Sequence, residues 1–248
     1  MKTVWTIAKR EYNQYFNSPI AYVVMFMTLL VLGIIFAVVF RNSMDSAMFG
    51  GGFTPDNSPI TGNLVFLMVF SAPALTMRLV SDELRMGTME LILTAPVRDW
   101  ELIVGKWLGA LLFILTLLAL TLVYPLILNS QINNGLDWGQ VLASYLGVLL
   151  VASAFLGLGV GISALFSNQA AAFFLSMGTF MFLWWLIGFP ANLVQGGAEV
   201  FQYLDMQSHF YNTFNAGQIV LADVVYYLSL TALGLFVGTS AVEMRRWR

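Results

Sequence analysis

Long runs of apolar residues, separated by short polar segments, make up most of this chain. A helix needs about 20 predominantly apolar residues to cross the hydrocarbon core of a bilayer. The longest run, from residue 141 to residue 189, would extend about 73 Å as one helix, against a core of about 30 Å. We therefore place a turn at the polar residues Ser167, Asn168 and Gln169. The pattern predicts an all-α polytopic membrane protein with six transmembrane helices, at about residues 20–40, 60–77, 102–128, 141–166, 170–189 and 221–242.

Composition supports this interpretation. Apolar residues make up 59% of the chain and charged residues 10%, whereas soluble domains average about 45–50% and about 25%. That balance leaves too little polar surface to cover a globule in water, so it indicates lipid as the solvent. We expect residues 1–248 to form a single transmembrane domain. Cysteine is absent, which excludes disulfides and thiolate metal sites.

Lysine and arginine are distributed unevenly between the predicted spans. Six crossings place almost all of them on one side of the membrane and leave Arg41 alone on the other. Because positive residues favour the cytosolic side, we expect both termini to be cytosolic. The predicted span centres carry no charge, and we expect no buried charge for an ion relay. The cytosolic cations are Lys2, Lys9, Arg10, Arg78, Arg85, Arg98, Lys106, Arg245, Arg246 and Arg248.

The segment from residue 1 to residue 17 has the period of an amphipathic helix that lies in the membrane interface. Its apolar side chains fall on one arc and most polar side chains fall opposite, although Ile7 and Glu11 break the pattern. Two roles remain open: a simple membrane anchor, or an element that contacts a soluble partner. The predicted apolar arc is Val4, Trp5, Ala8, Tyr12, Tyr15 and Phe16, and the residues selected for the interfacial role are Trp5, Lys9, Arg10 and Tyr12.

The loop between the second and third spans holds nine of the chain's 24 charged residues, all between residues 78 and 106. A charged helical turn is predicted first, followed by a bend at Gly87. Thr88 can then cap a short helix through Leu93, which must end before Pro96. The charged residues of the first turn are Asp82, Glu83 and Arg85.

The loop then leads into the third span, where Asp99 and Glu101 supply a cap and negative charge for the first helical turn. The loop is thus expected to form two short helices that lie across the membrane face. The alternative is a solvated, charge-balanced loop that merely satisfies the positive-inside bias.

Several short sequence patterns favour a structural role over a catalytic or nucleotide-binding role. Gly157, Gly159 and Gly161 lie inside an apolar span, so close helix packing is favoured over dinucleotide binding. The sequence has no P-loop motif, so any ATP must be held by another chain. His209 is the only histidine, and hydrogen bonding at the interface is its expected role. Pro73 is expected to bend or loosen its helix.

Pro125 is expected to act on the third span in the same way. An intramembrane enzyme would need a nucleophile and a base, or metal ligands, at membrane depth. The spans contain hydroxyl groups but no histidine or carboxylate near their centres, which disfavours that class. The hydroxyl residues are Ser71, Ser153 and Ser176.

A set of short motifs occurs along nearly the whole chain. They are Arg10-Glu11-Tyr12 with Ser18-Pro19, then Glu83-x-x-x-Gly87-Thr88-x-Glu90 with Thr94-x-Pro96-Val97, then Glu101 and Gly105-Lys106, and finally Ser208-His209-Phe210, Asp223-x-x-Tyr226-Tyr227 and Arg245-Arg246-Trp247. With these motifs the chain resembles the permeases of type 2 ABC transporters (the ABC-2 family), in particular those associated with gliding motility and with copper-enzyme maturation.

The resemblance implies a coupling helix in the first cytosolic loop, which would sit in a groove of a separate ABC ATPase. It also implies short external helices between spans five and six that cap the pathway. The residues implied in ATPase coupling are Asp82, Glu83, Arg85, Gly87, Thr88, Glu90, Thr94 and Pro96, and those of the external cap are Phe201, His209 and Phe210.

The resemblance further implies the partners and the location. Two ATPase copies would bind ATP and Mg, and this chain would hold no cofactor and no metal itself. A second copy of the permease, or a homologous one, would complete the pathway, with an accessory membrane protein as a further possible partner. The expected setting is the lipid bilayer of a prokaryotic plasma (inner) membrane, with no nucleic acid. The leading function is therefore a non-catalytic exporter permease, and the alternative is a membrane anchor or mechanotransmission scaffold without cargo transport.

Overall fold

A computed structural model describes residues 2–48, 56–90, 97–131, 135–192 and 198–246. Within these residues the protein is helical and contains no strand. Six helical segments are long and apolar enough to cross a membrane, which confirms the predicted all-α architecture with six spans. These segments are Pro19–Asp45, Ser58–Arg85, Asp99–Gln131, Trp138–Leu165, Gln169–Leu186 and Leu221–Arg246.

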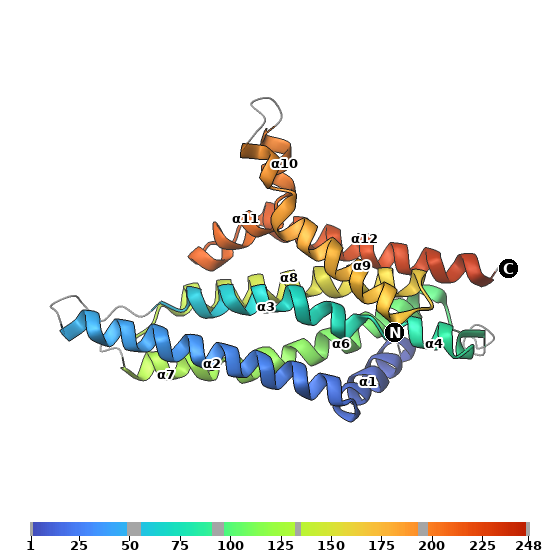
Figure 1. Cartoon of the computed structure of the whole chain (residues 1–248), viewed down its shortest axis with the longest axis horizontal. Coiled ribbons are helices and arrows are strands. Elements are labelled where there is room, and N and C mark those ends of the chain that lie inside the picture. Colours follow the sequence, from blue (N-terminus) through green and yellow to red (C-terminus); the bar gives the residue numbers. More distant parts are fainter. Residues whose placement is uncertain (1, 49–55, 91–96, 132–134, 193–197, 247–248) are drawn as a thin grey trace.

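The bundle is built from long helices that run alongside one another (Figure 1). Both ends of the chain lie toward the same end of this bundle (Figure 1). The helices of the first half are α1 (Lys2–Asn17), α2 (Pro19–Met48), α3 (Ser58–Thr76), α4 (Ser81–Arg85), α6 (Asp99–Thr121) and α7 (Val123–Gln131). Those of the second half are α8 (Trp138–Leu165), α9 (Gln169–Met181), the π-helix η1 (Phe182–Leu186), η2 (Phe189–Asn192), α10 (Ala198–Leu204), α11 (Met206–Tyr211), η3 (Phe214–Ala216) and α12 (Leu221–Arg246).

Helix α8 is the centre of the bundle, because 83% of its most apolar window is buried. It packs against α12 at backbone distance: a Cβ built on Gly161 would lie 2.5 Å from the carbonyl oxygen of Gly234. Beside this contact, the hydroxyls of Ser153 and Thr231 are 3.0 Å apart and form a hydrogen bond. Small residues thus let the two helices meet closely, which confirms the packing role predicted for the glycines of α8.

Capping residues and prolines account for the places where helices end or are divided. Helix α8 ends at Leu165, and the side-chain oxygen of Asn168 accepts a hydrogen bond from the backbone N–H of Ala170 at 2.9 Å to cap α9. The predicted turn is therefore confirmed. The third span is divided at Leu122, just before Pro125, whereas α3 continues through Pro73 for three further residues.

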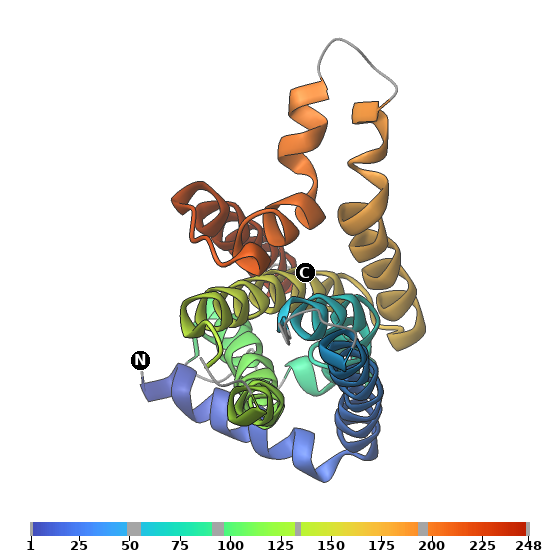
Figure 2. The same cartoon turned by 90° about the vertical axis from the view of Figure 1, so that its left-hand side faces the viewer.

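Helix α9 packs on α3 and α8, with Phe180 stacked on Phe155 of α8 at a ring-centroid distance of 4.6 Å. The chain then leads away from the bundle to α10, and α11 returns to it (Figures 1 and 2). Phe214 of η3 and Phe210 of α11 are fully buried, and both would meet a Cβ on Gly147 of α8. Short helices thus lie between the fifth and sixth spans, as predicted, and anchor to the end of α8 that carries residue 138.

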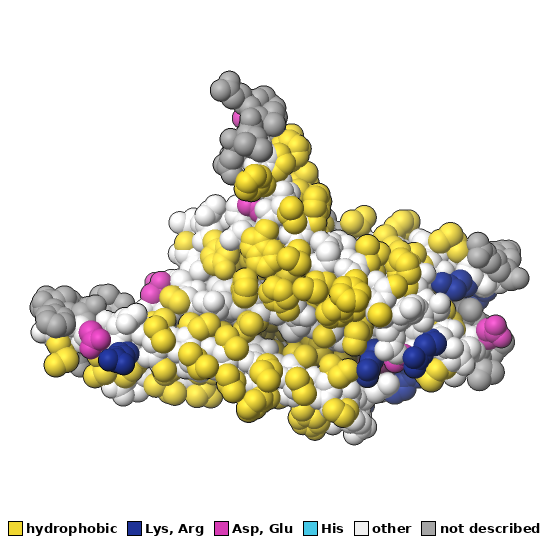
Figure 3. All heavy atoms as spheres, viewed as in Figure 1, with side chains coloured by type: hydrophobic (Ala, Val, Ile, Leu, Met, Phe, Trp, Pro, Cys, Tyr) yellow, Lys and Arg dark blue, Asp and Glu magenta, His cyan; other side chains and the backbone are white. Residues whose placement is uncertain are grey.

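The surface shows the same separation of apolar and charged residues as the sequence. Apolar side chains cover the middle of the molecule, and charged groups gather toward its two ends (Figure 3). We call the end that holds α1, α4 and the last residues of α12 the charged end. Most of the Lys and Arg side chains visible in Figure 3 lie there.

Candidate functional site: a buried charge cluster at the charged end

Helix α1 crosses the end of the bundle (Figure 2) and packs directly on α6. Two glycines of α6 make this approach possible. A Cβ on Gly105 would lie 2.8 Å from the Cβ of Ile7, and a Cβ on Gly109 would lie 2.6 Å from the Cβ of Glu11. The close contact at Gly109 also brings the carboxylate of Glu11 to Lys106, which lies one helical turn earlier on α6.

Lys106 is buried, with 1% of its side chain exposed. Its Nζ atom lies 3.1 Å from Oε1 of Glu11 and 2.8 Å from Oε1 of Glu83. Arg10 adds a second cation, because its Nη2 atom lies 2.8 Å from the same oxygen of Glu11 and 3.3 Å from that of Glu83. We call these four residues the charge cluster. It joins α1, α4 and α6.

The charge cluster balances two cations against two carboxylates. Only 6% of the Glu11 side chain and 14% of the Glu83 side chain are exposed, whereas Arg10 is 56% exposed. Moving an ion out of water costs several kcal/mol, and that cost is offset only by well-placed partners. The hydrogen bond to Glu11 raises the pKa of the Arg10 guanidinium, opposed by partial burial and reinforced by the charges of Glu11 and Glu83. Arg10 therefore stays charged.

The beginning of α4 is also fixed from the bundle side. The Ser163 hydroxyl of α8 accepts hydrogen bonds from the backbone N–H groups of Val80 and Ser81 at 3.2 and 3.1 Å, and donates to the carbonyl of Met77 at 3.2 Å. Ser163 is itself fully buried. The loop is therefore held at its start by α8 and at Glu83 by the charge cluster.

Beyond Glu83 the loop turns outward. Gly87 has φ +70°, a left-handed conformation that L side chains rarely adopt, so the predicted bend is confirmed. Arg85, Met86 and Glu90 are exposed around it. Thr88 is already helical, so the helix after the bend begins one residue earlier than predicted, and the Thr88 hydroxyl donates to the carbonyl of Glu83 at 3.4 Å.

The remaining predicted coupling residues take different positions. Oδ1 of Asp82 lies 4.0 Å from Nη2 of Arg85. Glu83 faces inward and contributes internal contacts, which its position in a charged loop did not suggest. Thr94 and Pro96, and the predicted end of the second short helix at Leu93, lie outside the described residues.

The loop rejoins the membrane at α6. The backbone N–H of Arg98 donates to Glu101 at 3.2 Å, so Glu101 caps the helix as predicted, with Arg98 rather than Asp99 at the cap position. Asp99 instead forms an ion pair with Arg246 at 3.4 Å, which connects the start of α6 to the end of α12.

The predicted apolar arc of α1 is only partly covered by the protein. Trp5 of this arc is 57% exposed, whereas Ala8 is fully buried together with Glu11, the residue that breaks the apolar pattern and is 5% exposed. The hydroxyl of Tyr12 lies 3.0 Å from that of Thr116 on α6, and Lys9 is exposed. The reason is that α1 packs on a protein surface that offers a lysine, so its buried face includes a carboxylate.

A second polar cluster lies between α11 and α12. Nδ1 of His209 is 2.6 Å from Oδ1 of Asp223, and Nε2 is 2.7 Å from the carbonyl of Tyr203. The imidazole also stacks on Tyr226, with ring centroids 4.3 Å apart. The predicted hydrogen-bonding role of His209 is therefore confirmed.

The other two predicted cap residues differ in burial. Phe210 is fully buried, and Phe201 is partly exposed. Among the described residues, no group of three or more His, Cys, Asp or Glu side chains is placed to hold a metal ion.

Sequence reasoning missed that Lys106 and Glu11 are partners, and it expected no buried charge in the spans. Lys106 of α6 and Asp223 of α12 are both buried, close to the ends of their spans. The available signal was a lysine inside an apolar run, flanked by Gly105 and Gly109 at the spacing that lets another helix approach. That combination indicates a partner carboxylate on the approaching helix.

Comparison with known protein families gives one match. The family described as "ABC-2 family transporter protein" matches residues 5–242, nearly the whole chain. No curated protein matches the chain. The matched range includes all four residues of the charge cluster and the pair of His209 and Asp223.

Proposed function

Because the chain belongs to the ABC-2 transporter family, and is therefore the membrane component of an ABC transporter, we propose that it is the permease of an ATP-driven exporter. It is coupled to a separate ABC ATPase through residues 81–96. The observation that supports this most is the charge cluster, because it fixes the start of that loop to two membrane elements at once.

The first step is contact with the ATPase. Arg85, Met86 and Glu90 are exposed at the outer part of the loop, around the bend at Gly87. A charged pair beside an apolar methionine suits docking into a groove of mixed polarity. Glu83 takes part from the inside, since it holds the loop to the bundle. Thr94 and Pro96 belong to the proposed docking segment by sequence.

The second step is transmission. A displacement of α4 acts on Glu83, and through Lys106 on α6 and through the shared ions on α1. Opening the cluster would leave buried charges without partners, which costs several kcal/mol. The cluster therefore favours movement of α1, α4 and α6 as a unit. ATP binding by the ATPase biases the inward- and outward-facing arrangements of the permease through this unit.

The assembly follows from the same reasoning. Two permease chains enclose the pathway between them, and two ATPase subunits hold ATP and Mg at the charged end. That end faces the cytosol of a prokaryotic cell, with the chain in the plasma membrane and both termini inside. The unequal distribution of Lys and Arg supports this orientation (Figure 3).

The test combines Arg85→Ala with Glu90→Ala in the permease, purified with the ATPase that accompanies it from its native membrane. We expect the variant to retain its fold but to lose co-purification of the ATPase and stimulation of ATP hydrolysis. The matched control is Arg41→Ala with Asp45→Ala, an exposed ion pair of 3.9 Å at the other end of α2. Equal loss in both variants, or in neither, contradicts the proposed docking surface.

The alternative function, a membrane scaffold that transmits force without moving cargo, would use the same linkage. ATP-dependent movement of cargo across proteoliposomes that hold the purified complex separates the two functions. An active ATPase coupled to the loop without any transported cargo would favour the scaffold.

A further inference from the structure

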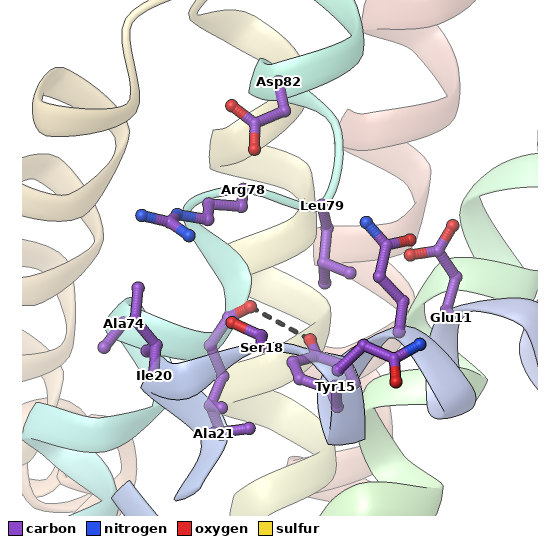
Figure 4. A pocket seen from close by; sticks show the side chains of 12 residues that line it. Glu11, Tyr15, Ser18, Ile20, Ala21, Ala74, Arg78, Leu79 and Asp82 are labelled. Atoms are coloured by element: carbon purple, nitrogen blue, oxygen red, sulfur yellow. Dashed lines mark hydrogen bonds between the residues drawn. The ribbon is translucent and has the colours of Figure 1, made fainter. Parts of the chain in front are cut away.

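A cavity of about 260 Å³ lies beside the charge cluster, between the end of α1, the start of α2 and the segment that joins α3 to α4. Its polar lining includes Gln14, Asn17 and Ser18, and two charged residues, Arg78 and Asp82 (Figure 4). Its apolar lining comes from short side chains and from leucine and isoleucine. The lining is therefore amphipathic.

The cavity lies where two spans reach the membrane boundary. Ser18 directly precedes the first span at Pro19, and Arg78 and Asp82 belong to the last turns of the second span. Along α2, the side chains that follow the cavity are apolar and exposed, beginning with Tyr22 and Val23. The cavity thus lies at the level of lipid headgroups, next to a surface that suits acyl chains.

Three charged residues line the cavity, and two of them, Arg78 and Asp82, have hydrogen-bonding groups without a partner among the described residues. Among the described residues, no hydrogen bond or ion pair involves the side chain of Arg78, which is exposed. Oδ1 of Asp82 is buried without a hydrogen-bond partner in the described part of the chain, and its nearest cation, Arg85, is 4.0 Å away. Glu11 also lines the cavity, but its Oε1 is occupied by Arg10 and Lys106.

We propose that this cavity binds the headgroup of an amine-bearing zwitterionic phospholipid of the phosphatidylethanolamine kind. The Arg78 guanidinium donates two parallel hydrogen bonds to the phosphate, because its planar shape favours this bidentate geometry. The primary ammonium donates to Asp82, whose buried oxygen lacks a donor. The amides of Gln14 and Asn17 offer further donors to the phosphate and glycerol oxygens.

This chemistry discriminates among headgroups. Phosphatidylcholine carries a cation, but its trimethylammonium group has no N–H to donate to Asp82. Phosphatidylglycerol has no cation, so its phosphate would bind Arg78 with Asp82 unneutralised. The volume of about 260 Å³ is below the range of about 300–1,000 Å³ that holds whole drug-sized ligands, which fits a headgroup with its acyl chains outside.

The test measures lipid retention by native mass spectrometry of the purified chain in detergent, titrated separately with phosphatidylethanolamine, phosphatidylcholine and phosphatidylglycerol. We expect phosphatidylethanolamine to bind at least about tenfold more tightly, as one charge-assisted hydrogen bond provides. Arg78→Gln should weaken the binding of all three lipids, because each carries the phosphate, whereas Asp82→Asn should abolish the preference for phosphatidylethanolamine, because it loses the acceptor for the amine.

Two further variants complete the design. Ala74→Phe fills the cavity without altering a charge, so it should reduce phosphatidylethanolamine retention as Arg78→Gln does. Arg41→Gln, at the other end of α2, should leave retention unchanged. Soluble phosphoethanolamine should not compete at the same concentrations, because it lacks the acyl chains. Competition by it would show a site for a soluble phosphate and would overturn the lipid assignment.

Equal retention of the three lipids by the unaltered chain would overturn the proposal, since it would show only annular lipid. The same conclusion would follow if Ala74→Phe and Asp82→Asn both bound phosphatidylethanolamine as the unaltered chain does. These two variants carry the test if Arg78→Gln does not fold.

Discussion

Replacing Lys106 by methionine removes the ammonium group on which two buried carboxylates converge, while it keeps a side chain of similar length. Glu11 and Glu83 would then face each other with 6% and 14% of their side chains exposed. Removing one partner of a buried ion pair typically costs about 3–5 kcal/mol. Arg10 remains, but it is 56% exposed, and such pairs contribute about 0–1 kcal/mol. We therefore expect a loss of about 2–4 kcal/mol.

The assay is thermal unfolding of the purified protein in detergent, with the fraction folded followed by circular dichroism. A matched variant combines Lys106→Met with Glu11→Gln and Glu83→Gln. It leaves no buried charge of the cluster without a partner, so most of the lost stability should return. A loss below about 1 kcal/mol for Lys106→Met, or no recovery in the triple variant, would refute the reasoning. Below its unfolding temperature, the single variant should also show weaker coupling between ATP hydrolysis and transport.

Three further predictions test other parts of the structure. Gly161→Ala forces a Cβ to within 2.5 Å of the Gly234 carbonyl, so it should destabilise the protein by about 1–3 kcal/mol in the same unfolding assay, whereas Gly178→Ala, with nothing within 4 Å, should not. Gly87→Ala places a side chain at φ +70°, which costs about 1–2 kcal/mol locally, and should reduce stimulation of the ATPase with little change in the unfolding temperature. Burial raises the pKa of Asp205 from 3.8, so the folded state prefers the protonated acid, and the stability this provides at low pH is lost as pH rises through the raised pKa. Asp205→Asn should therefore be more stable than the unaltered protein at pH 7.5, and an advantage that did not shrink toward pH 4 would contradict this cause.

The membrane architecture could be predicted because it depends on local composition. Run lengths fixed the number of spans, and the polar residues at 167–169 fixed the turn that sets their parity. The bend at Gly87 and the close packing of Gly161 were also predictable, since each depends on what one residue type permits. These features can be predicted without knowing which helices contact one another.

The charge cluster could not be predicted in the same way, because its members come from distant parts of the chain. Lys106 is 95 residues from Glu11 and 23 from Glu83. Helical periodicity placed Glu11 among the apolar residues of α1, but it could not show which side chain of another helix would neutralise its charge. The contact of His209 with Asp223 likewise depends on how α11 returns to α12.

The central claim is that the loop at the charged end is cytosolic and held by an ATPase. The sequence contains no cysteine, so single cysteines can be introduced without interference. Met86 of the loop is 62% exposed, and Met48 at the other end of the bundle is 84% exposed. In native membranes, Met86→Cys should cross-link to the ATPase and resist a membrane-impermeant thiol reagent added outside, whereas Met48→Cys should react with that reagent and form no such link. A Met86→Cys variant that reacts from outside, or an ATPase linked to Met48→Cys instead, would contradict the account.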